Sequence, residues 1–214
     1  MTRGKAQSRA RLALKWERIL ERDLEIILVR MAKLLAKYAN RQSLAERAIQ
    51  KYEPIMERVI LSRSSAVARA FIEIADRDMN PRQRKHEPDV FEIKRRIDTV
   101  AIANRSAIAW LKERGGRLVR GITERLRKKL STTLQRGSRA GAGEDELAAM
   151  VERAFSGEIA RGRAARIART EIHTASNHGT IEAARASERD LIKIWLAVED
   201  KRTRKAHAKV DGQE

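Results

Sequence analysis

The chain has 214 residues, enough for one or two domains with a hydrophobic core. Only 4% of its residues are aromatic, so few large side chains can supply burial energy, and a compact enzyme core is not expected. The formal charge of +18 favours a polyanionic partner, either nucleic acid or an acidic protein surface. Absent cysteine excludes disulfides and thiolate chemistry, and we find neither a membrane-spanning stretch nor a signal peptide.

The first part of the chain has helical periodicity. Apolar residues recur every three or four positions from Leu12 to Tyr38, the spacing that lines one helix face. Ser43 followed by Glu46 has the pattern of a capping box, which predicts the start of a second helix. Pro54 lacks an amide donor, so we expect it to kink or restart that helix.

Two further helices are predicted after a proline-containing loop over residues 76–88. Pro88 suits the first turn of the third helix, which we expect Gly115 and Gly116 to end or bend. The fourth helix has a leucine-rich stripe at four-residue spacing, formed by Leu118, Ile122, Leu126, Leu130 and Leu134.

The composition changes after the fourth helix. The glycine content of residues 137–143 predicts a flexible hinge, and the acidic residues 144–146 suit the positive end of a new helix. We therefore place a domain boundary here. Residues 1–136 are expected to form an elongated basic helical region that docks on a partner, and residues 144–214 a C-terminal domain.

The overall prediction is a mainly α protein with a small α+β C-terminal domain. Ala168, Ala175 and Gly179 share one side of a helix over about residues 160–187, where another element could come very close. Polar residues line a different side of this helix: Arg166, Thr170, His173 and Asn177. The run from Leu191 to Val198 predicts a strand, and Asp211-Gly212 a turn, after which the domain is expected to be incomplete.

Cations dominate the segment from 117 to 139, which has eight basic residues and one acid, Glu124. The basic residues are Arg117, Arg120, Arg125, Arg127, Lys128, Lys129, Arg136 and Arg139. Spread over the exposed side of a helix, they are suited to non-specific contact with double-stranded DNA, which needs phosphate contacts but no base readout. The alternatives to DNA contact are that these cations bind an acidic groove on a protein partner or that they are simply exposed to solvent.

The C-terminal polar residues allow several interpretations. His207 with Asp200 or Asp211 could form an acid/base pair, and the same residues with His173 or His178 could bind a metal. Arg169 and Glu171 could belong to a nucleotide-handling site. We favour buried hydrogen-bonded pairs that lock the domain, because no known nucleophile, phosphate loop or metal motif accompanies them. We therefore predict no catalytic residue, no metal and no cofactor.

The polar residues of the last part of the chain resemble the phage Mu protein F-like family of minor head, or head morphogenesis, proteins of tailed bacteriophages. The resemblance rests on an ordered motif: Arg166, Arg169, Thr170, Glu171, Asn177, Trp195, Asp200, Arg202, His207, Asp211 and Gly212. It covers roughly the last 60 residues. Family members usually continue past Asp-Gly with more strands, which this chain lacks.

The resemblance implies a virion protein inside the phage head, assembled in the host cytoplasm. Expected partners are the portal protein, with several copies around it, packaged double-stranded DNA, and a scaffold or major capsid protein, but no membrane. The implied role is head assembly and genome packaging or delivery, without enzymatic activity. The alternatives are a nuclease or nucleotide-modifying enzyme delivered with the genome, built on Glu171, Asp200, His207 and Asp211, and a bacterial DNA-compacting protein.

Overall fold

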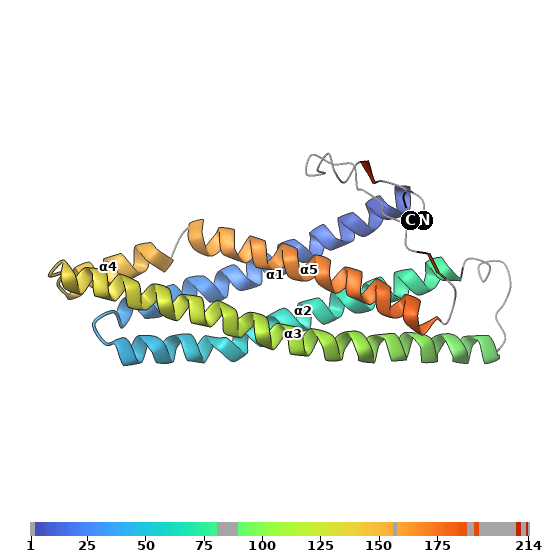
Figure 1. Ribbon diagram of the computed structural model, residues 1–214, viewed down its shortest axis with the longest axis horizontal. Helices are drawn as coiled ribbons and strands as arrows, with labels where there is room; N and C mark the ends of the chain where they lie inside the picture. Colours follow the sequence, from blue (N-terminus) through green and yellow to red (C-terminus); the bar gives the residue numbers. More distant parts are fainter. Residues whose placement is uncertain are drawn as a thin grey trace. The chain divides into compact units, whose positions relative to one another are not determined.

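The protein is described from a computed structural model, which covers residues 3–80, 90–155, 158–187, 191–192, 209–210 and 213. Within these ranges the chain forms five α-helices and no strand (Figure 1). The helices are α1 (Arg3–Lys37), α2 (Gln42–Met79), α3 (Val90–Arg139), α4 (Glu144–Phe155) and α5 (Glu158–Ala186). The prediction of a mainly α protein is therefore confirmed.

The chain divides into two compact units. Unit 1 consists of Met1–Trp16, Ser65–Ile108 and His173–Glu214, and unit 2 consists of Glu17–Ser64 and Ala109–Ile172. The division falls inside α1, α2, α3 and α5, so each of these helices contributes a segment to both units. Only α4 belongs entirely to one unit, unit 2. The predicted domain boundary at residues 137–143 stays a prediction.

Unit 2 has a core of large aliphatic side chains. The predicted stripe of α1 is buried in it, including Leu20, Leu24 and Met31, each no more than 1% exposed. Of the leucine-rich stripe of α3, the three middle residues Ile122, Leu126 and Leu130 are buried, and Leu118 and Leu134 at its ends are half-buried. Burial of such side chains supplies about 1.5–3 kcal/mol each, so helical periodicity accounts for this core.

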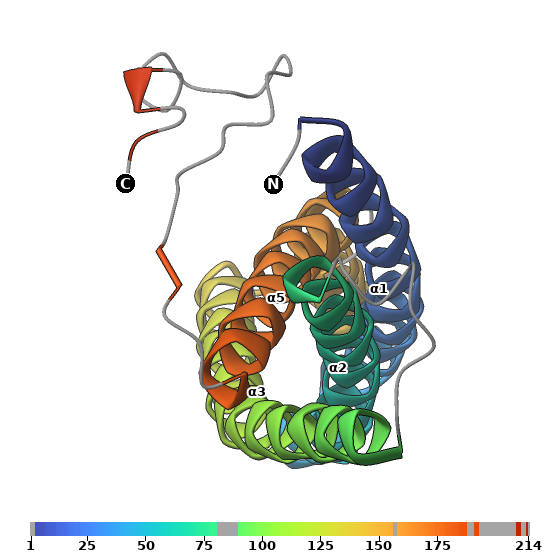
Figure 2. The ribbon, with the colours of Figure 1, turned by 90° about the vertical axis from the view of Figure 1, so that its right-hand side faces the viewer.

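Unit 1 is packed mainly through small residues, and its segments of α1, α2, α3 and α5 can be followed in Figure 2. Ala175 and Ala183 of α5 are buried, and so is Gly179 between them. A Cβ atom added to Gly179 would lie 2.5 Å from the carbonyl oxygen of Ala68 in α2. The predicted close approach at the small-residue side of α5 is therefore confirmed, and the neighbouring element is α2.

Neither of the two positions where a helix was expected to end, restart or bend ends its helix. The third and fourth predicted helices are one helix, α3, which continues through Gly115 and Gly116. Both glycines are buried, and a Cβ on Gly116 would lie 3.3 Å from the Glu57 carboxylate of α2. Tertiary packing thus overrides the unfavourable helix propensity of glycine, about 1 kcal/mol per residue. Similarly, α2 continues through Pro54, whose side chain is exposed.

The turn between α3 and α4 has a regular helix-capping geometry. Gly141 has a φ of 69°, a left-handed conformation that glycine adopts without strain. The amide of Ala142 donates to the carbonyl of Gly137, and the amide of Gly141 donates to the carbonyl of Ser138. This pair of hydrogen bonds is the Schellman motif, which ends α3. The Glu146 carboxylate then accepts from the amide of Gly143, which caps the start of α4.

The prediction of a small α+β C-terminal domain is wrong. In the described part of residues 144–214, the regular structure consists of α4 and α5, and no strand is present. Of the predicted strand, only Leu191 and Ile192 are described; they are 48% and 68% exposed and have no regular structure. A strand needs a paired neighbour and a buried face, and these two residues have neither. The remainder of that run, residues 193–198, lies outside the described residues.

Candidate functional site

A buried ion pair joins α3 and α5 inside unit 2. Glu171 of α5, an acidic residue of the family-like motif, is only 2% exposed. Arg114 of α3 donates to both of its carboxylate oxygens, from Nε at 3.1 Å and from Nη2 at 2.9 Å. The Arg114 guanidinium also lies 5.5 Å from the centre of the Trp110 ring, a cation–π distance. The bidentate geometry fixes how the two helices are aligned, and the positive charge of Arg114 neutralises the buried carboxylate of Glu171.

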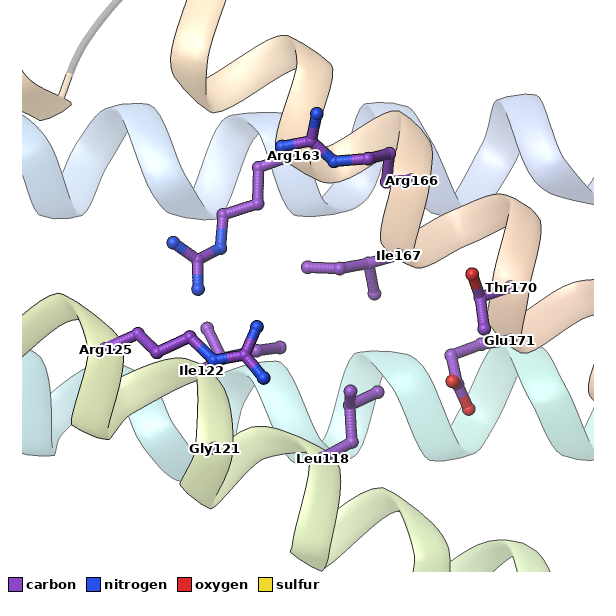
Figure 3. Close-up of a pocket in the computed structure, with 9 residues that line it drawn as sticks. All are labelled: Leu118, Gly121, Ile122, Arg125, Arg163, Arg166, Ile167, Thr170 and Glu171. Atoms are coloured by element: carbon purple, nitrogen blue, oxygen red, sulfur yellow. The ribbon is translucent and has the colours of Figure 1, made fainter.

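Next to this ion pair lies a pocket of about 310 Å³ between α3 and α5 (Figure 3). Its lining residues recur every three or four positions, as one face of each helix does. From α3 they are Leu118, Gly121, Ile122 and Arg125, and from α5 they are Arg163, Arg166, Ile167, Thr170 and Glu171. Gly121 has no side chain to fill this space. The pocket therefore combines an apolar lining with charged ends.

Three arginines line the pocket: Arg125, Arg163 and Arg166. In Figure 3, Arg163 of α5 and Arg125 of α3 extend into the space between the helices, and Glu171 lies at the opposite end. Burial lowers the pKa of the partly buried Arg163, and the nearby cations Arg125 and Arg166 lower it further. Arginine nevertheless stays charged at neutral pH. Within the described residues, none of the three forms an ion pair.

A fourth cation lies close to this cluster. Burial lowers the pKa of Lys129, and repulsion from Arg163 lowers it further. Its ammonium lies 5.5 Å from the centre of the Phe155 ring of α4, which gives it a cation–π contact. Uncompensated positive charge of this kind is suited to binding an anion.

The eight predicted DNA-binding residues differ in their surroundings. Arg117 forms an exposed ion pair with Glu113 at 2.8 Å, and Arg127 one with Glu53 of α2 at 3.4 Å. Arg125 and Lys129 belong to the cationic cluster described above. The other four are exposed and form no ion pair with any residue that the structure describes: Arg120, Lys128, Arg136 and Arg139.

The structure brings only part of the family-like motif together. Arg166, Thr170 and Glu171 line the pocket, and the guanidinium of Arg169 lies 3.8 Å from the Glu17 carboxylate of α1. Asn177 is exposed and belongs to unit 1. The remaining motif residues lie outside the described residues: Trp195, Asp200, Arg202, His207, Asp211 and Gly212.

Two site residues were not anticipated from the sequence. Arg163 could have been found, because it precedes Arg166 by three residues and so shares its helix face. Arg114 pairs with a residue 57 positions away, and its local sequence gives no signal of that partner. Among the described residues, no group of three or more His, Asp or Glu side chains could hold a metal ion.

Residues 124–214 match the family described as phage Mu protein F like protein. The match includes α4, α5 and the pocket arginines Arg125, Arg163 and Arg166. No curated protein and no solved structure shows a significant match to the chain. In the described residues, no helix is long and apolar enough to cross a membrane.

The match over this C-terminal region therefore supports the resemblance that the motif predicted. This match points to a head-morphogenesis protein of a phage, associated with the virion.

Proposed function

We propose that the protein is a minor head protein of a tailed phage that associates with the portal inside the head and contacts packaged double-stranded DNA non-specifically. It assembles in the host cytoplasm, in several copies around the portal, together with a scaffold or major capsid protein. Its role is in head assembly and in genome packaging or delivery. The family match supports the assembly role. The main support for DNA contact is the set of exposed, unpaired cations on α3.

These cations and other basic residues of α3, including the ion-paired Arg117 and the pocket residue Arg125, follow a regular spacing. Lys128 follows Arg117 by 11 residues, and Arg139 follows Lys128 by another 11. Eleven residues correspond to about three helical turns with a rotation of roughly 20°, so the three side chains form one row along the helix. Arg125 and Arg136 form a second row with the same spacing. Repeated cations along one rigid element suit a repeating phosphate backbone and require no base readout.

The proposed role is structural rather than catalytic. Glu171 is the one acidic residue of the motif that the structure describes. Its carboxylate is buried and accepts two hydrogen bonds from Arg114, so it is engaged in holding two helices together. A carboxylate in this position supports packing rather than acid/base chemistry on an external substrate.

DNA contact is tested by the salt dependence of binding. In the α3 variant, Arg120, Lys128, Arg136 and Arg139 are replaced by glutamine. In the matched control, four exposed cations of α1 are replaced instead: Arg18, Arg22, Arg30 and Lys33. Both variants lose three arginines and one lysine, so they have the same net charge.

We expect the wild type to bind a duplex oligonucleotide with an affinity that falls steeply from 50 to 200 mM salt. Four lost phosphate contacts should reduce the slope of log K against log salt by about 3 to 4. The α1 control should keep a slope close to that of the wild type. Equal slopes for both variants would show that net charge, rather than the α3 surface, determines binding.

Portal association is tested with the intact chain. We expect it to co-sediment with purified portal rings, and mass spectrometry of purified phage heads to detect it at a few copies per particle. Heads that lack the protein would contradict the proposed role.

A further inference from the structure

The arginine cluster at the α3–α5 pocket differs from the four unpaired α3 cations in that its members line a pocket, although Arg125 and Arg166 are exposed as well. Arg125, Arg163 and Arg166 come from two helices yet lie close enough for the positive charges of the other two to affect Arg163. The folded protein holds these like charges together beside a pocket, and no described carboxylate neutralises them. Glu171, the acidic lining residue, is already paired with Arg114 at the other end. Such an arrangement is unfavourable until an anion binds.

We infer that this pocket is a binding site for a phosphate group, in which Arg125, Arg163 and Arg166 hold the phosphate oxygens. The inference goes beyond the proposed function, because it requires neither the portal nor the exposed α3 cations. It adds a specific ligand site to a protein for which only non-specific phosphate contact has been proposed.

Phosphate fits this site better than a carboxylate does. A phosphate monoester has a charge of about −1.5 to −2 at pH 7 and three strong acceptor oxygens, whereas a carboxylate has one charge and two oxygens. Three guanidinium groups can therefore share one phosphate, each through charge-assisted hydrogen bonds.

The remainder of the pocket indicates how the ligand lies. Leu118, Ile122 and Ile167 line its middle, and the Glu171 carboxylate stands at the far end. An anion is disfavoured beside Glu171, so the phosphate belongs at the arginine end and an uncharged body belongs against the aliphatic side chains. The volume of about 310 Å³ lies at the lower end of the range for small-ligand pockets. A nucleoside monophosphate and a backbone phosphate of DNA both carry this chemistry.

Thermal unfolding of the intact protein tests the site, with inorganic phosphate as the probe and sodium chloride at equal ionic strength as the reference. A ligand that binds only the folded state raises Tm with its concentration. We expect phosphate to raise Tm more than chloride does. Equal shifts in the two salts would overturn the inference, because they would reflect general screening of the +18 charge.

Single substitutions then test the assigned residues. Arg163→Gln and Arg166→Gln should each weaken phosphate binding by about tenfold or more, since each removes charge-assisted hydrogen bonds. In the absence of phosphate, Arg163→Gln should raise Tm, because it relieves repulsion among like charges. The matched control is Arg127→Gln, on the same helix as Arg125 but paired with Glu53. A loss of phosphate binding in Arg127→Gln equal to that in Arg163→Gln would also overturn the inference.

Competition experiments distinguish the sources of the phosphate. Adenosine monophosphate and a duplex oligonucleotide without terminal phosphates are each titrated against phosphate-saturated protein. Displacement by the nucleotide alone supports a small-molecule ligand, and displacement by the duplex supports capture of a backbone phosphate. If neither displaces it, free phosphate is the ligand. If the duplex binds the Arg163→Gln variant with wild-type affinity, DNA contact by the exposed α3 cations does not depend on the pocket. The phosphate-site proposal and the DNA-contact proposal can therefore fail independently.

Discussion

Arg114 and Glu171 form a bidentate ion pair in which the carboxylate is almost completely buried and the guanidinium remains about one-third exposed. The pair connects α3 to the motif segment of α5 within unit 2. Water cannot replace Arg114 as the partner of a carboxylate at 2% exposure. Packing of the motif helix therefore depends on one arginine that lies before the family-matched residues 124–214.

Removal of Arg114 should strongly destabilise the protein. Arg114→Met leaves the buried Glu171 carboxylate without its counterion, which we expect to lower the free energy of unfolding by about 3 kcal/mol. Urea denaturation followed by circular dichroism measures the change. The double variant Arg114→Met/Glu171→Leu should recover most of the loss, because it leaves no unpaired buried charge. If the double variant is as unstable as the single one, the buried charge is not the cause.

An exposed ion pair of the same helix provides the comparison. Arg117 and Glu113 have side chains that are 61% and 66% exposed. Arg117→Gln should therefore change the free energy of unfolding by less than about 0.5 kcal/mol. Equal losses for Arg114→Met and Arg117→Gln would contradict the importance of burial.

Close packing between α5 and α2 makes Gly179 intolerant of a side chain. In Gly179→Ala the new methyl group would lie 2.5 Å from the carbonyl oxygen and 3.0 Å from the Cα of Ala68, which are backbone atoms. We expect a loss of about 1–3 kcal/mol from overpacking, measured by urea denaturation. Gly162→Ala on the same helix is the control, because no atom lies within 4 Å of its added Cβ. It should stabilise the protein by about 0.5–1 kcal/mol.

Much of this packing follows from local sequence patterns. The buried residues Leu20, Leu24 and Met31 have the periodicity of one helix face, and the small-residue side of α5 predicted a close neighbour. Such patterns identify which face is buried but not what covers it. That is why α2 as the partner of Gly179, and Arg114 as the partner of Glu171, could not be predicted.

The incorrect predictions have a physical explanation as well. Gly115 and Gly116 have poor helix propensity, but α3 continues through them because both glycines are buried, as are Leu111 and Val119 nearby. The run beginning at Leu191 has the composition of a strand, yet strand formation depends on a neighbouring strand that a sequence pattern does not supply. At the two glycines, tertiary packing overrides the low helix propensity. At Leu191 and Ile192, both exposed, no neighbouring strand in the described part of the chain supports the strand propensity.

The turn after α3 should depend on the left-handed conformation of Gly141. Its φ of 69° is unfavourable for residues with a Cβ atom, so Gly141→Ala should lower the free energy of unfolding by about 1–2 kcal/mol. Gly141→Asn should lose less, because asparagine tolerates this conformation. Thermal unfolding of both variants measures the order. Equal losses would point to an effect of side-chain size rather than of backbone conformation.

The ion pairs of Asp78 in unit 1 should make stability depend on acidity. Lys5 and Arg9 of α1 contact the two carboxylate oxygens of Asp78 at 2.5 and 2.9 Å. Burial raises the pKa of this carboxyl, but the hydrogen bonds and positive charges of Lys5 and Arg9 outweigh it and lower the pKa below its ordinary value. The folded state therefore favours the ionised carboxylate, and its stabilising effect is fully present above the ordinary pKa of about 3.9.

That stabilisation should disappear as the pH falls through the lowered pKa of Asp78. We expect wild type to be more stable than Asp78→Asn at pH 6, and the difference to shrink progressively below about pH 4. Urea denaturation of both proteins from pH 6 to pH 2 measures it, with Asp98→Asn, an exposed position of α3 without an ion pair among the described residues, as the control. A difference that is constant over this range would show that the ionised carboxylate contributes nothing and that Asp78 acts only through its shape.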